Sequence, residues 1–153
     1  MRFSLKEGDC VGKFTKSIEI EASPEKVFTF INDDKKLNEA NKDVKVETTS
    51  EGPVGVGTTR HFVGTAGGKW DMETTEFVKN KKIAARTIGA GDMKITESWT
   101  LEPTAKGTKL TASMDYELPY SLLGKLVDKV RVSKVIEKST IQMLENAKKA
   151  LEA

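Results

Sequence analysis

The pattern of apolar and polar positions takes on a sustained helical period near residue 120 of this chain. From Ser121 to Leu151 the apolar residues recur with helical spacing, there is no proline, and the one glycine is Gly124. This predicts one long amphipathic helix. The segments before it alternate between apolar and polar residues, as half-buried strands do.

The first alternating segment, residues 14–22, predicts a strand that ends at a helix start signal. Ser23 is a good N-cap and Pro24 suits the first helical position, so a short helix should follow up to about residue 32. A second short helix is predicted around 35–41. Short turns typical of antiparallel hairpins separate six further predicted strands, at 44–49, 58–65, 69–79, 82–88, 93–102 and 108–118.

A long helix with one apolar stripe needs a partner, and the sheet is the partner available. We therefore expect an α+β fold, one domain over residues 1–153, in which a curved antiparallel sheet of six to seven strands wraps around the C-terminal helix. One helix about 10 Å wide covers few strands, so an apolar cavity should remain. Strand parity assigns these residues to the concave face: Ile18, Ile20, Val44, Val46, Phe62, Trp70, Met72, Thr74, Ile83, Ala85, Thr87, Ile95, Trp99, Leu101, Leu110, Ala112, Met114 and Tyr116.

Polar residues share the parity of this apolar face, and buried polar groups need partners. Arg60 and Glu97 lie in phase with the face, as do Glu76 and Tyr116. One interpretation is that Arg60 and Glu97 form a buried ion pair or lie in water near strand ends. The other is that these groups orient one end of an apolar ligand, or act as acid and base. His61 has the opposite parity and should point to solvent.

Two segments are candidates for the cavity entrance. The apolar stripe of 122–130 is offset by roughly a quarter turn from that of 132–151, which predicts either a bent helix or a movable cover. The loop from Gly52 to Gly57 is either a flexible turn or a mobile lip. It lacks the ending of a phosphate-binding loop, and a strand follows it.

Composition excludes several classes of function. The net charge is +2, from 25 basic and 23 acidic residues, which gives no case for nucleic acid or an anionic membrane as partner. The lone cysteine, Cys10, forms no internal disulfide, and no apolar run suits a signal peptide or a membrane span. We therefore expect a cytoplasmic protein without stable membrane insertion. Cys10 and His61 are too few for a zinc site, so neither a metal nor a cofactor is expected.

Several local motifs occur in an order typical of one superfamily. They are residues 18–28 (IEIEASPEKVF), residues 55–58 (GVGT), and residues 97–103 (ESWTLEP) with Gly107 and Thr108. With the long closing helix, these motifs resemble the START-like helix-grip (SRPBCC) superfamily, especially its polyketide cyclase/dehydrase-like branch. The resemblance covers nearly the whole chain and implies the helix-grip fold. The superfamily includes lipid carriers, plant ligand-binding proteins, cyclases, oxygenase domains and chaperone co-activators, so it implies no single function.

The sequence favours a protein that binds a small hydrophobic molecule, such as a lipid, isoprenoid or polyketide-like compound, with transport as an open extension. A cyclase or dehydratase acting on a polyketide-like substrate is the first alternative, and a chaperone co-activator-like module is the second. Ligand identity, catalysis and oligomeric state stay open. The candidate ligand-binding residues are Arg60, Phe62, Trp70, Met72, Thr87, Ile95, Glu97, Trp99, Met114, Tyr116, Leu123, Leu126, Val127 and Val130.

Overall fold

The computed structural model describes the backbone of residues 10–65, 68–89, 94–118 and 126–153, and the side chains of these ranges except at 10–11, 118 and 126–132. Its elements are β1 (Cys10–Ile20), α1 (Pro24–Ile31), α2 (Asp34–Ala40), β2 (Val44–Thr48), β3 (Thr59–Gly64), β4 (Lys69–Val78), β5 (Lys82–Ile88), β6 (Lys94–Pro103), β7 (Thr108–Leu118) and α3 (Leu126–Glu152).

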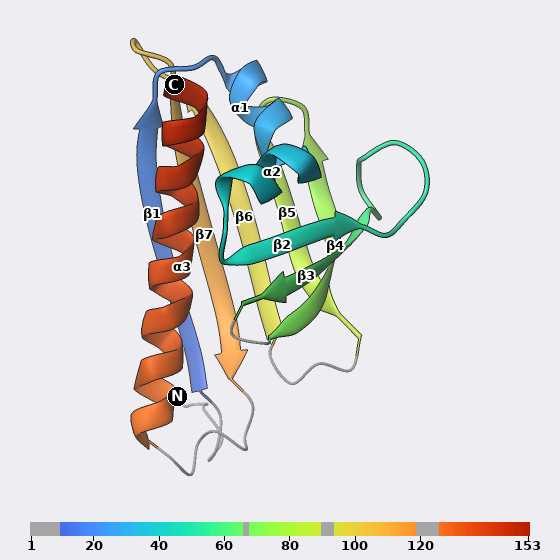
Figure 1. The fold of residues 1–153 in the computed structure, drawn as a ribbon, viewed down its shortest axis with the longest axis vertical. Helices are drawn as coiled ribbons and strands as arrows, with labels where there is room; N and C mark the ends of the chain where they lie inside the picture. The colour runs from blue at the N-terminus through green and yellow to red at the C-terminus, as the bar shows by residue number, and fades with distance from the viewer. Residues whose placement is uncertain (1–9, 66–67, 90–93, 119–125) are drawn as a thin grey trace, which may run out of the picture.

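The strands form one curved, seven-stranded antiparallel sheet in the order β1-β7-β6-β5-β4-β3-β2. Strands β2 to β7 follow one another as a meander, and β1 pairs with β7 at the edge. Figure 1 shows all three helices on the hollow side of this sheet. The predicted α+β fold is confirmed, with its order of one strand, two short helices, six further strands and a long helix.

The two short helices begin at side chains that cap them. Ser23 accepts a hydrogen bond from the backbone N–H of Lys26 at 3.3 Å, and Pro24 is the first residue of α1. Helix α2 begins in the same way, because Asp33 accepts from the backbone N–H of Lys36 at 3.1 Å. These caps satisfy N–H groups that have no partner inside the helix. Both helices cover part of the hollow that α3 leaves open (Figure 1).

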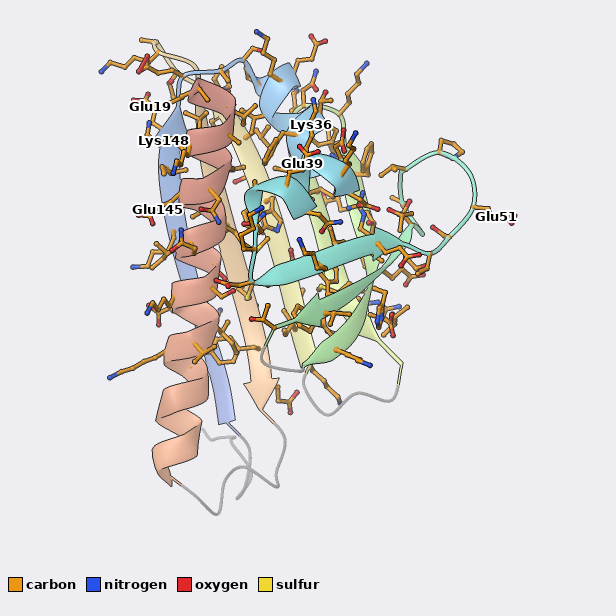
Figure 2. The ribbon with its side chains drawn as sticks, viewed as in Figure 1. Glu19, Lys36, Glu39, Glu51, Glu145 and Lys148 are labelled. Carbon is orange, nitrogen blue, oxygen red and sulfur yellow. The ribbon has the colours of Figure 1, made fainter. Side chains whose placement is uncertain are left out.

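Helix α3 lies along β1 and β7, at one side of the hollow (Figure 1). Its C-terminal end is held to the edge strand by two side chains. Lys148 Nζ donates to the carbonyl of Glu19 at 2.9 Å, and the Glu152 carboxylate accepts from the backbone N–H of Glu21 at 2.8 Å. Figure 2 shows Lys148 beside Glu19. Hydrogen bonds from Lys148 and then from Glu21 lower the pKa of Glu152.

A β-bulge interrupts the alternation of β4. Thr74 pairs with Ala85, whereas Glu76 pairs with Ala84, so Thr75 is one residue more than the partner strand can match. An extra residue in one strand reverses which side chains face the core beyond that point. The side chains of β4 therefore change faces after Thr74.

The bulge overturns one prediction about the inner face. Continuing the alternation of β4 placed Glu76 on the concave face, which is wrong, because Glu76 is exposed and its carboxylate lies 3.0 Å from Lys82 Nζ. Phe77 takes the inward position instead, with its ring centroid 5.1 Å from that of Phe28. The bulge thus exchanges a charged residue for an aromatic one in the core.

The apolar core fills the hollow where α1 and α3 meet the sheet. Its largest fully buried apolar side chains are Ile20, Val27 and Leu110, and Leu144 packs there from α3. Such burial contributes about 1.5–3 kcal/mol for each large aliphatic side chain. Within the described ranges, no helix has both the length and the apolar composition that crossing a membrane requires.

Candidate functional site

An apolar cavity lies in the hollow of the sheet beside this core. Strands β2 to β7 form its floor, and α1, α2 and the C-terminal half of α3 form its roof. Its volume is about 80 Å³, measured as the space open to the centre of a water-sized sphere. One water needs roughly 10–15 Å³ by this measure, so a small molecule or one end of a larger molecule fits. The lining residues are Phe30, Ile31, Leu37, Asn41, Val46, Arg60, Phe62, Met72, Thr74, Ile83, Ala84, Ala85, Glu97, Trp99, Leu110, Met143 and Ala147.

Arg60 brings a positive charge to this apolar lining, and its side chain is only 10% exposed. Its Nε lies 3.5 Å from Asp34 Oδ1 and donates to Thr48 Oγ1 at 3.3 Å, while Nη2 donates to the carbonyl of Asn32 at 3.4 Å. Burial lowers the pKa of Arg60, and the charges of Asp34 and then Glu97 oppose that shift. The interpretation in which Arg60 forms an ion pair with Glu97 is therefore wrong in its partner, since the close carboxylate is that of Asp34.

Glu97 is an ionisable group of the cavity with a different environment. Its carboxyl is enclosed by protein although the residue as a whole keeps some accessible surface, and that burial raises its pKa. A hydrogen bond donated by Trp99 Nε1 and the charge of Arg60 oppose this shift without cancelling it. A carboxyl that keeps its proton to a higher pH can donate a hydrogen bond or a proton to a bound molecule.

The residues that contact the Arg60 guanidinium line a different hollow from the cavity. Asn32, Asp34 and Thr48 line an open groove between α1, α2 and the sheet edge, and none of them lines the cavity. Two of their oxygens, Asn32 Oδ1 and Asp34 Oδ1, are buried and accept no hydrogen bond from the described residues. Arg60 thus lines the cavity while residues of the groove hold its guanidinium.

The structure brings together five of the fourteen candidate ligand-binding residues. Arg60, Phe62, Met72, Glu97 and Trp99 line the cavity. All five come from the strands β3, β4 and β6, at positions whose parity points inward.

The other candidate residues lie elsewhere. Three of them, Trp70, Thr87 and Ile95, line a separate depression. It lies at the end of the sheet where β4 and β6 begin and β5 ends. Met114 and Tyr116 are buried on the same concave face in β7 and do not line the cavity. Leu123 lies outside the described residues, as do the side chains of Leu126, Val127 and Val130 in α3.

Sequence reasoning missed the roof of the cavity. Phe30, Ile31, Leu37 and Asn41 reach it from the two short helices, and Met143 and Ala147 reach it from α3. The helical spacing of Ile31, Met143 and Ala147 indicated that they face the core, but no pattern along the chain shows which strands the helices cross. No sequence pattern marked Asn41 as a residue of the cavity. It is held because its Oδ1 accepts a hydrogen bond from Asn146 Nδ2 at 2.9 Å.

The two predicted entrance segments do not line the cavity in the described part of the structure. The Gly52–Gly57 loop extends away from the body of the molecule, with Glu51 pointing outward in Figure 2. Its base is fixed to the sheet, because Gly57 N–H donates to the carbonyl of Thr74 at 2.9 Å. The stretch predicted as a cover, 122–130, lies outside the described side chains.

His61 lies on the outer face of β3, as its parity predicted. Its Nδ1 is 2.7 Å from Asp71 Oδ1 on the neighbouring strand. In the described ranges, no group of three His, Cys, Asp or Glu side chains is placed to hold a metal ion.

Comparisons with known proteins agree with this architecture. No protein of curated function matches the chain significantly in sequence. Among solved structures, TTHA0849 from Thermus thermophilus shares 22% identity with a TM-score of 0.75, covering 93% of this chain and 97% of its own. MLL2253 from Mesorhizobium loti shares 19% with a TM-score of 0.73, covering 92% and 97%.

A third similar structure comes from a larger protein. The di-domain ARO/CYC StfQ from the steffimycin biosynthetic pathway shares 18% identity with a TM-score of 0.77, over 93% of this chain and 51% of StfQ. At these identities the likeness shows the fold alone. The family model described as polyketide cyclase/dehydrase and lipid transport matches residues 11–152, nearly the whole sequence. This chain therefore belongs to the polyketide cyclase/dehydrase and lipid transport family.

Proposed function

We propose that this protein binds a small hydrophobic molecule, such as a lipid, isoprenoid or polyketide-like compound, in the cavity beneath α1, α2 and α3. The observation that carries the proposal is an apolar cavity with polar groups at one end. Ligand sites in proteins have this composition, with apolar walls for affinity and a few polar groups for orientation. Arg60 and Glu97 are the polar groups that would orient the ligand. A chain with one cysteine can form no internal disulfide, which suits a reducing compartment, so we propose that this activity is cytoplasmic.

The tryptophans give a direct test. The chain has two, and Trp99 lines the cavity whereas Trp70 does not. In a Trp70→Phe variant, fluorescence reports on the cavity alone. Titration with apolar molecules should change the Trp99 emission saturably, and native mass spectrometry of protein purified from its own cells should show one bound.

A variant that fills the cavity, together with a matched control on the outer face, tests where the ligand binds. Ala85 lines the cavity, so Ala85→Phe should abolish the Trp99 response at a stability cost of about 1–3 kcal/mol for overpacking. Thr96→Phe adds the same ring on the exposed outer face of β6 and should leave binding unchanged. Equal binding by both variants would place the ligand outside this cavity.

Catalysis is the second candidate function, favoured by one observation. Burial raises the pKa of Glu97 inside the cavity, which is the property required of a general acid in a cyclase or dehydratase. An enzyme of this kind would lose turnover in Glu97→Gln while keeping ligand affinity, because glutamine preserves the shape and removes the proton. Turnover of a polyketide-like substrate that is unchanged in this variant would remove Glu97 from the mechanism.

A further inference from the structure

The guanidinium of Arg60 is held by residues that do not line the cavity. An arginine carries five N–H donors, and the hydrogen bonds that the described residues accept from Arg60 engage Nε and Nη2. All of those acceptors belong to residues that line the outer groove, while Arg60 itself also lines the cavity. Its three polar contacts are 3.3 to 3.5 Å long, near the limit for such bonds. These bonds leave Nη1 without an acceptor among the described residues, so the guanidinium keeps donor capacity for a molecule in the cavity that Arg60 lines.

The charges around Arg60 leave it able to bind an anion. Asp34 faces Nε and is itself 26% exposed, so water screens part of its charge. Glu97 is the carboxyl on the cavity side, and burial favours its neutral form by raising its pKa. Arginine keeps its charge in proteins. An apolar cavity with a buried cation at one end is a site for an apolar molecule with an anion at one end.

We propose that the ligand is an apolar monocarboxylic acid whose carboxylate binds the cavity side of Arg60 while its hydrocarbon part fills the apolar space. This rests on the proposed function and names the chemical class of its ligand. Charge-assisted hydrogen bonds between guanidinium and carboxylate are among the stronger polar contacts in proteins, and more so away from water. Arg60 is then the residue that determines specificity, and Asp34 is an anion that competes with the ligand for its charge.

Octanoate and octan-1-ol form a matched pair of probes, because they share their chain and differ in the charged end. Calorimetry at neutral pH should show octanoate binding about tenfold or more tightly, the ratio that corresponds to 1.4 kcal/mol. Arg60→Gln should remove this preference and keep the binding of octan-1-ol. The control is Arg86→Gln, an exposed arginine on the outer face paired with Glu73, which should keep the preference.

A second variant, with the opposite expected effect on affinity, distinguishes a change in specificity from a loss of fold. Asp34→Asn removes the negative charge beside Arg60 and keeps an oxygen that can accept from the backbone N–H of Thr48. The affinity for octanoate should rise several-fold, because Arg60 has lost a competing anion, and that for octan-1-ol should stay the same. A lesion that only damaged the structure would weaken both probes together.

The outcomes separate the two proposals. Preference for octanoate that depends on Arg60 supports the assignment of an acidic ligand. Equal binding of octanoate and octan-1-ol, or a preference that survives in Arg60→Gln, overturns that assignment and leaves the binding function standing. Failure of both probes to change the Trp99 emission overturns the binding function and the acidic ligand with it.

Discussion

Arg60 and His61 are neighbours in β3, yet their side chains meet opposite surroundings on the two faces of the sheet. Inside, Arg60 is 10% exposed and its Nε lies 3.5 Å from Asp34. Outside, His61 is 35% exposed and its Nδ1 lies 2.7 Å from Asp71. The shorter contact is the one that water can replace and screen, so it contributes little. The longer contact lies where a lost partner is not replaced, so distance alone does not rank the two pairs.

The ion pairs of the outer face are as exposed as the contact of His61 with Asp71. Lys82 lies 3.0 Å from Glu76 and Arg86 lies 3.3 Å from Glu73, with every side chain about one-third exposed or more. Pairs of this kind support solubility and strand register. The inner pair instead leaves Asp34 Oδ1 buried without a hydrogen bond from the described residues, which lowers the stability of the fold.

The two faces should differ most in stability when the aspartate that contacts Arg60 or His61 is removed. Asp34→Ala removes the partner of Arg60 and the acceptor for the backbone N–H and hydroxyl of Thr48. Unfolding in urea should show a loss of about 3 kcal/mol, at the lower end for breaking a buried pair because Asp34 is partly exposed. Asp71→Ala should lose at most about 1 kcal/mol. Equal losses would mean that the inner pair is as well hydrated as the outer one.

The bulge of β4 offers the same comparison in a second pair of neighbours. Phe77 packs against Phe28 in the core, so Phe77→Ala should lower the free energy of unfolding by about 2 kcal/mol, below the range for a wholly buried ring. Glu76→Ala, on the outer face, should change it by at most about 1 kcal/mol. If the exposed glutamate proved the more important of the two, the bulge would be misplaced.

The fold was predictable because its signals are local and agree with one another. Ser23 and Pro24 mark a helix start, and short turns separate alternating segments, so the order of elements followed from the sequence. The parity of Arg60, His61 and Glu97 was also right, since no irregularity lies between those residues and the anchors of their strands. Parity failed at Glu76, because a bulge at Thr75 adds one residue and no local signal announces it.

The site was only partly predictable, since a cavity is made by elements far apart in sequence. Strand parity identified five lining residues, but the roof depends on where α1 and α2 cross the sheet, which no pattern states. The partner of Arg60 was missed for the same reason. Asp34 reads as a residue of the first turn of α2, and only the packing of α2 against β2 brings it to Arg60.

A third difference between the faces should depend on pH. Glu97 has a folded-state pKa above its ordinary value of 4.5, so its contribution to stability is fully present below pH 4.5 and is lost as the pH rises through the folded-state pKa. Glu97→Gln cannot titrate. Its stability relative to the wild type should therefore rise with pH above 4.5, by at most about 1.4 kcal/mol per pH unit.

Denaturation at a series of pH values measures this slope, and the same subtraction for Glu76→Gln on the outer face gives the background. If the difference in unfolding free energy between Glu97→Gln and the wild type stays constant with pH, the Glu97 carboxyl is hydrated in the folded protein. Its environment would then be like that of the exposed carboxylates on the outer face.

The smallest effect should be the coupling between His61 and Asp71. Both are at least one-third exposed and already adjacent in the register of β3 and β4, so their contact adds little to the sheet. A double-mutant cycle of His61→Ala and Asp71→Ala should give a coupling of about 0.2–1 kcal/mol, and added salt should reduce it further. A coupling above that range and insensitive to salt would mean that the outer face shields its charges as the inner face does, and the contrast between Arg60 and His61 would no longer rest on exposure.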